Sequence, residues 1–146
     1  MAASLLLTAA CAHAATGRII KVLPLFLDRQ GRQMLAPSLY ERDAYQAFLL
    51  AHPKLQAGML FEIQWKTKGQ PAAPLKLRVE LRGMAEGQLP KLLVMEQKVK
   101  RTHWFSRWTA MKLSGKDFKT FGRETAWRVT LWQGDEILAH EQSFLW

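Results

Sequence analysis

The sequence has little cysteine, few acidic residues and no long apolar run. Its one cysteine, Cys11, cannot form a disulfide within the chain, and a zinc site built from several cysteines is excluded. The longest apolar stretch lies near the N-terminus and is shorter than the roughly 20 residues that a membrane-spanning helix needs. Six prolines and nine glycines are too few for a collagen-like or low-complexity chain.

The composition is that of one folded domain with a basic surface. Of 146 residues, 49% are hydrophobic and 23% are charged, which is enough apolar material to bury a core. The 21 Lys and Arg outnumber the 12 Asp and Glu, so the net charge is +9. A charge of this size favours contact with acidic partners.

The N-terminal residues predict export. Residues 2–12 carry no charge, and Ala12-His13-Ala14-Ala15 offers small residues around a cleavage point, so residues 1–14 are interpreted as a signal peptide. The mature domain would then span residues 16–146 in the periplasm or outside the cell. No Lys or Arg precedes Arg18, and the alternative is an Ala- and Leu-rich buried helix.

The alternative form of export is that of a lipoprotein. The segment Thr8-Ala9-Ala10-Cys11 resembles the lipobox of bacterial lipoproteins, although Thr8 stands where that motif usually has Leu. The resemblance implies lipidation of Cys11 and attachment to a membrane by this anchor.

One segment has helical periodicity, residues 38–52. Ser38 and Glu41 have the spacing of a capping box, and Pro53 ends the segment. The residues that fall near one face of this helix are Leu39, Tyr40, Ala44, Phe48 and Leu49.

The rest of the chain has the period-2 alternation of strands. The clearest run is 75–82, in which Leu or Val alternates with a charged residue. About seven strands, with the helix inserted between the first two, predict a mainly β chain with the fold of an antiparallel two-sheet β-sandwich; a closed barrel is the alternative. The predicted strands are 18–27, 59–66, 75–82, 92–100, 104–113, 126–132 and 137–146.

Residues 58–146 resemble immunoglobulin-like or fibronectin-type-III-like domains. Phe118–Gly122 would enter a strand in which Trp127 and neighbouring apolar residues are buried, and a hairpin would return the last strand. A cysteine pair is absent and Phe121 stands where a corner tyrosine is expected, so the resemblance transfers no functional residue. The chain as a whole is similar to short exported bacterial proteins of unknown function.

The alternation within the predicted strands indicates which tryptophans lie in the core and which face outward. Trp65 and Trp127 are in phase with apolar neighbours and should be core, whereas Trp132 should face the other side. The favoured interpretation is that the helix at 38–52 covers that side and buries Trp132 with Phe48 and Leu49. The alternative is an exposed aromatic patch of Trp104, Trp108, Trp132 and Trp146.

No motif predicts catalysis, a cofactor or a metal. The histidines beyond the N-terminal segment, His52, His103 and His140, are far apart in sequence, and no cysteine accompanies them. Glycines occur singly, as turn residues of a β protein do, so no phosphate-binding loop is expected.

The basic charge is concentrated in residues 91–123. Nine Lys and Arg against two acids give this segment +7 of the net charge of +9. Bases and aromatics interleave at its centre, which is typical of a surface for polyanions or anionic lipids, although Lys and Arg also keep edge strands from pairing. The candidate surface consists of Lys98, Lys100, Arg101, His103, Trp104, Arg107 and Trp108.

These observations predict a non-enzymatic, exported β-sandwich that acts as a structural or interaction module of the bacterial periplasm or envelope. Its partner would be an unknown protein or an anionic envelope component. One alternative is a small envelope hydrolase or carbohydrate-active protein with a cleft between helix and sandwich. Another is a cytoplasmic protein that binds polyanions or nucleic acid.

Overall fold

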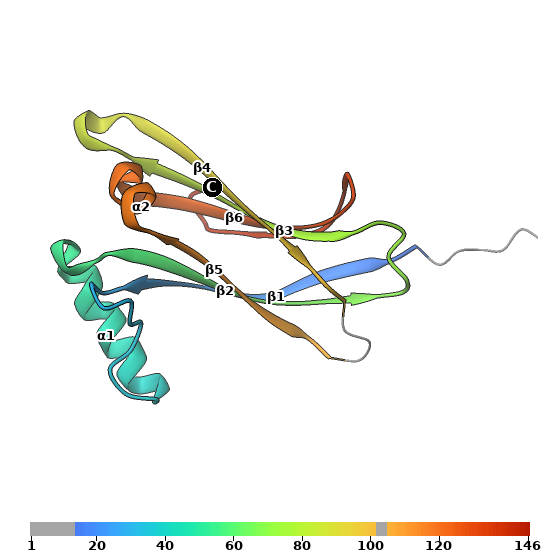
Figure 1. Cartoon of the computed structure of the whole chain (residues 1–146), viewed down its shortest axis with the longest axis horizontal. Coiled ribbons are helices and arrows are strands. Elements are labelled where there is room, and N and C mark those ends of the chain that lie inside the picture. Colours follow the sequence, from blue (N-terminus) through green and yellow to red (C-terminus); the bar gives the residue numbers. More distant parts are fainter. Residues whose placement is uncertain (1–13, 102–104) are drawn as a thin grey trace, which may run out of the picture.

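The computed structural model describes residues 14–101 and 105–146. These residues form seven strands, two α-helices and two short 3-10 helices (Figure 1). In chain order the elements are β1 (Thr16–Leu27), α1 (Leu39–Ala51), η1 (Pro53–Leu55), β2 (Gly58–Lys68), β3 (Leu75–Met84), η2 (Glu86–Gln88), β4 (Pro90–Val99), β5 (Arg107–Ser114), α2 (Gly115–Phe121), β6 (Arg123–Gln133) and β7 (Glu136–Gln142).

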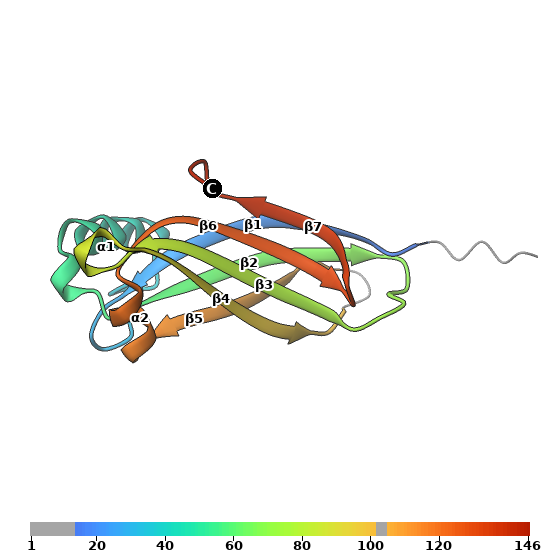
Figure 2. The same cartoon turned by 90° about the horizontal axis from the view of Figure 1, so that it is seen from above.

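The strands pair into two sheets. One sheet has three strands in the order β1-β2-β5, and the other has four in the order β4-β3-β6-β7. All neighbouring strands are antiparallel. The sheets are stacked as two layers, with both α-helices at the same end of the molecule (Figures 1 and 2). The prediction of a mainly β chain with two antiparallel sheets is confirmed, and the closed barrel is wrong.

The alternation in β2 and β3 brings one apolar row from each sheet into the space between the layers. Trp65 is only 1% exposed, and its indole N–H donates to Thr109 Oγ1 at 2.9 Å, so the polar atom of this core side chain is satisfied. The core consists of Ile19, Met59, Phe61, Ile63, Trp65, Leu75, Leu77, Val79, Leu81, Met111, Leu113, Phe121, Val129 and Leu131.

Trp127 and Trp132 lie on β6 and face opposite sides of the four-stranded sheet. Trp127 packs against the core, edge-on to Phe61 with 6.5 Å between ring centroids. Trp132 lies on the outer face, where the Arg78 guanidinium is 5.0 Å from its ring centroid. The strand phase predicted for β6 is therefore right.

Helix α1 packs on β1, against the outer face of the three-stranded sheet. Leu49 of α1 is 0% exposed, and Leu25 and Leu27 of β1 are buried outside the main core, so they form a second apolar layer under the helix. The prediction that this helix covers Trp132 is wrong. The connection from β1 to α1, residues 28–38, returns the helix to the sheet that contains β1.

The outer edge of β1 is covered in two ways. The Gln46 side chain of α1 takes the place of a neighbouring strand, because Phe26 N donates to Gln46 Oε1 at 2.6 Å and Gln46 Nε2 donates to Phe26 O at 2.9 Å. Further along, β1 lies beside β7, and a Cβ at Gly17 would be 2.8 Å from Leu138 Cβ. The two layers are thus closed on the β1–β7 side, and β4 and β5 form the opposite side.

Residues 115–121 form helix α2, where the resemblance implied that residues 118–122 enter the strand predicted at 126–132. Phe118 and Phe121 are three residues apart and so share one face of a helix, and both pack on the core. Gly83 leaves room for the Phe121 ring, since a Cβ there would lie 2.6 Å from it. Residues 118–121 thus lead into β6 as a helical turn, which the sequence did not predict.

A buried carboxylate ties the loop after β1 to α1. Asp28 is 4% exposed and accepts hydrogen bonds from Gln30 N, Arg32 N, Arg32 Nε and the Tyr45 hydroxyl, the last at 2.7 Å. Burial alone would raise the pKa of Asp28, but these hydrogen bonds outweigh it and lower the pKa to about 2. Ser38 precedes α1 at the N-cap position but makes no side-chain capping bond, so the predicted capping box does not form.

We expect Trp65→Ala to lower the free energy of unfolding by about 3–5 kcal/mol, because it removes a fully buried indole from between the sheets. Trp108→Ala is the matched control, since Trp108 is 50% exposed on β5 and its loss should cost about 1 kcal/mol or less. Urea unfolding of both variants measures this difference. Equal losses would contradict the position of the core.

We expect acid to weaken the fold through Asp28. Its pKa is about 2 in the folded chain and about 4 when unfolded, so the stability that it contributes is complete above pH 4 and is lost as the pH falls toward 2. Asp28→Asn replaces one accepting oxygen with an NH₂ group that faces other donors. It should lower the free energy of unfolding by roughly 2 kcal/mol at pH 7. Thermal unfolding from pH 7 to pH 2 should show a smaller acid-induced fall in melting temperature for this variant. A fall equal to that of the wild type would contradict the role of Asp28.

Candidate functional site

The predicted basic surface lies on the open side of the molecule, where the chain passes from β4 to β5. Lys98 is on β4, Lys100 follows it, and Arg107 and Trp108 begin β5. The candidate residues His103 and Trp104 lie outside the described residues, as does Cys11.

Four of the predicted residues line one hollow. This edge hollow has a volume of about 400 Å³ and lies between the end of β4 and the start of β5. Arg107 Nη1 donates to the Lys100 carbonyl at 2.7 Å, which holds the two chain segments together. Arg101 does not line it, because its guanidinium donates to Gln70 in the loop after β2. The lining residues are Gln97, Lys98, Val99, Lys100, Arg107, Trp108, Thr109 and Ala110.

The cations of the edge hollow have no anionic neighbour within the described ranges. No carboxylate lines the hollow, and Lys98, Lys100 and Arg107 form no ion pair there. Glu96 on β4 is engaged elsewhere, since hydrogen bonds from Arg78 and Lys76 lower its pKa. The edge hollow is therefore a concentration of uncompensated positive charge beside an indole.

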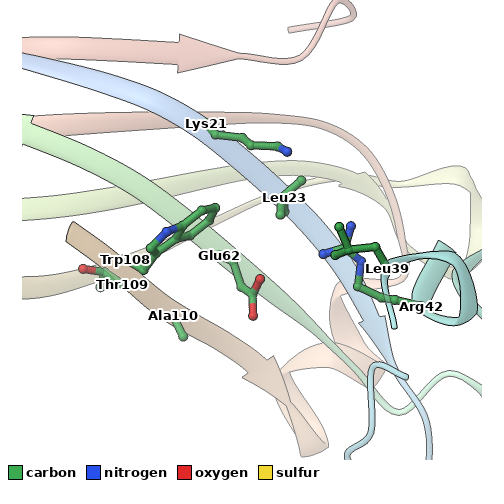
Figure 3. A pocket seen from close by; sticks show the side chains of 8 residues that line it. All are labelled: Lys21, Leu23, Leu39, Arg42, Glu62, Trp108, Thr109 and Ala110. Carbon is green, nitrogen blue, oxygen red and sulfur yellow. The ribbon is translucent and has the colours of Figure 1, made fainter. Parts of the chain in front are cut away.

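A second hollow lies on the outer face of the three-stranded sheet and shares Trp108, Thr109 and Ala110 with the first (Figure 3). This face hollow also has a volume of about 400 Å³. The Trp108 indole lies over β2 near Glu62, and Arg42 of α1 stands on the far side (Figure 3). Its lining residues are Lys21, Leu23, Leu39, Arg42, Glu62, Trp108, Thr109 and Ala110.

The face hollow was not predicted from the sequence. Antiparallel register places Lys21 of β1 opposite Gln64 of β2, and Gln64 opposite Trp108 of β5. These residues are distant along the chain and become neighbours only through strand pairing. Alternation shows that each faces outward, but it does not show which outward residues share a row.

The tryptophans do not form one patch. Trp132 lies on the outer face of the four-stranded sheet, whereas Trp108 belongs to the other sheet, and Trp104 is outside the described residues. Two guanidinium groups lie close to the Trp146 ring, that of Arg82 at 4.1 Å and that of Arg128 at 4.6 Å from its centroid. The alternation in β3 places Arg78 and Arg82 on the outer face of the sheet. There, both guanidinium groups stack on indoles.

An end hollow of about 570 Å³ lies between the end of α1 and α2, where the alternative prediction of an enzyme needed a cleft. It contains one carboxylate, Glu124, and burial raises the pKa of that carboxyl. Neither His52 nor His140 lines it; His52 stacks on Phe48 at the end of α1, and His140 is exposed on β7. Its lining residues are Phe26, Leu50, Pro53, Gln56, Met59, Phe118, Lys119, Gly122, Arg123 and Glu124.

Within residues 14–101 and 105–146, no three His, Cys, Asp or Glu side chains converge as metal ligands would. In the same part of the chain, no helix has the length and apolar character needed to cross a bilayer.

We expect Glu124→Gln to stabilise the protein at pH 7 but not at pH 3. Because the folded pKa of Glu124 is raised, the neutral acid is favoured in the fold, and stability is lost as the pH rises from the unfolded pKa through the folded one. Glutamine stays neutral and avoids this loss. The melting temperatures of the wild type and the variant at pH 7 and pH 3 measure this effect. An equal change at both pH values would show that the Glu124 carboxyl is solvated.

Comparison with known proteins gives no relative: no family model, no curated protein and no solved structure matches this chain.

Proposed function

We propose that the protein is a non-enzymatic interaction module whose working surface is the edge hollow. One observation carries the proposal: Lys98, Lys100 and Arg107 line a single hollow beside the half-exposed indole of Trp108, and no acidic side chain of the described residues lines it. Uncompensated cations attract an anionic partner over distances of about a Debye length, and an aromatic side chain adds contact area. The partner is an anionic component of the envelope or an acidic protein.

The strand order supports an immunoglobulin-like or fibronectin-type-III-like identity for the sandwich. In an immunoglobulin constant-type domain the first, second, fifth and fourth strands form one sheet, and the third, sixth and seventh form the other. This chain has the same assignment except that its fourth strand pairs with the third. Such sandwiches commonly serve as binding modules, which is an argument by analogy at the level of fold.

The distribution of acidic groups favours binding over hydrolysis. A glycosidase or other acid–base hydrolase needs two titratable groups in different environments at one site. Among residues 14–101 and 105–146, each of the three hollows described above is lined by at most one carboxylate and by no histidine. The end hollow is the place at which a hydrolase would have to act, and its single Glu124 faces apolar side chains and two cations.

We propose that the protein is periplasmic or secreted, because we interpret residues 1–14 as a signal peptide. Intact mass and cell fraction, measured after expression in a bacterial host, test this: a mature chain that starts near Ala15 in the periplasm supports export, and one that starts at lipidated Cys11 supports an anchor. Full-length protein in the cytoplasm would contradict export and make nucleic acid the first partner to test.

The surface is tested by charge reversal. We expect a triple change of Lys98, Lys100 and Arg107 to Glu to weaken binding to heparin and to anionic vesicles at least about tenfold, with stability nearly unchanged. The control triple, Arg29, Lys54 and Lys116 to Glu, has the same net charge and also removes one side-chain bond to a carbonyl, that from Arg29 to Lys54. Column retention and vesicle co-sedimentation measure both. Equal losses would mean that net charge alone drives binding, and unchanged binding by the first triple would overturn the proposal.

A further inference from the structure

The outer edge of β5 is free of backbone partners in the part of the chain that the structure describes. The three-stranded sheet ends at β5, and among the described residues no backbone group of residues 107–113 is recorded as bonded to anything but β2. By contrast, the Gln46 amide covers part of the edge of β1, and β7 lies beside that strand.

β5 lacks two of the features that keep edge strands from pairing, proline and a bulge, while its Arg107 and Lys112 disfavour pairing with another basic strand. Proteins protect such edges with proline, bulges, exposed charges such as Lys, or charges that point into the sandwich. The strand has no proline, its register with β2 is unbroken from Arg107 to Ser114, and its inward side chains include Met111 and Leu113, which are buried in the core. β1, in comparison, has Pro24 and a register shift after Ile19.

The two hollows flank this edge strand. The face hollow lies on the outer surface of the sheet, the edge hollow lies between β5 and β4, and both are lined by Trp108, Thr109 and Ala110. Successive side chains of an extended peptide point to opposite faces. A peptide paired along β5 would therefore place one row of side chains on the outer face beside Trp108 and the alternate row toward the edge hollow, which is the geometry of β-strand addition.

The charge at the edge selects the peptide. Lys98, Lys100 and Arg107 line the edge hollow, and Lys112 is exposed further along β5. Resting on the function proposed above, we propose that the partner is an acidic polypeptide segment that binds as an added strand along the free edge of β5. The backbone of the segment supplies the hydrogen bonds, and its Asp and Glu side chains meet the cations. Anionic polysaccharides and lipids supply the charge but not a peptide backbone.

The test uses the whole protein and two synthetic peptides of about ten residues in which Asp or Glu alternates with Val or Thr. The second peptide is N-methylated at three alternate backbone amides, which removes edge hydrogen bonds and keeps charge and composition. Titration calorimetry gives both affinities. Amide hydrogen exchange by NMR shows whether the β5 N–H groups that point away from β2, at every second residue, become protected.

We expect the unmodified peptide to protect alternate amides of β5, and the N-methylated peptide to bind about tenfold or more weakly. Equal binding of the two peptides without protection would overturn strand addition while the edge hollow remained an anion site. Failure of both peptides and of heparin to bind would overturn the proposed function as well. Concentration-dependent protection of β5 in the absence of peptide would identify a second copy of the chain as the occupant and overturn the acidic segment.

Discussion

Burial of two apolar rows between the sheets is the interaction on which the rest of the structure depends. Phe61, Ile63 and Trp65 of β2 face the apolar row of β3 and β6, and these side chains are almost completely removed from water. Because successive residues of a strand point to opposite faces, this burial also fixes which polar residues face outward. The rows that contain Lys21, Glu62 and Trp108 are therefore consequences of the core.

The two sides of the sandwich differ in whether their edge strands are covered. On one side, Gln46 supplies an amide to β1, and the absence of a side chain at Gly17 allows β7 to lie against it. On the other side, the last strand of the three-stranded sheet is regular and has cations around it. The chain itself thus covers the edge of β1. The outer edge of β5, in contrast, has no neighbouring strand among the described residues.

The sequence predicts the parts of this fold that depend on local periodicity. The alternation from Leu75 to Leu81 places β3 correctly, and the pattern around Trp127 places β6 with the right face inward. Helix α2 was missed because it is only seven residues long and Ser114-Gly115 at its start has the composition of a turn. The packing of α1 and the row from Lys21 to Trp108 depend on which strands become neighbours, and hydrophobic periodicity within one segment contains no information about that.

Helix α1 is attached to the sandwich by a small area. Leu49 is its one fully buried side chain among the described residues, and hydrogen bonds from Gln46, from Tyr45 and from Gln56 to the Leu49 carbonyl attach it further. A segment with so little buried surface opens locally at a lower free energy than the global unfolding of the core. Since Leu39 and Arg42 at the start of α1 form one wall of the face hollow, that hollow exists only while the helix is docked. Its shape therefore follows the local opening equilibrium of one helix, and the edge of β5 does not.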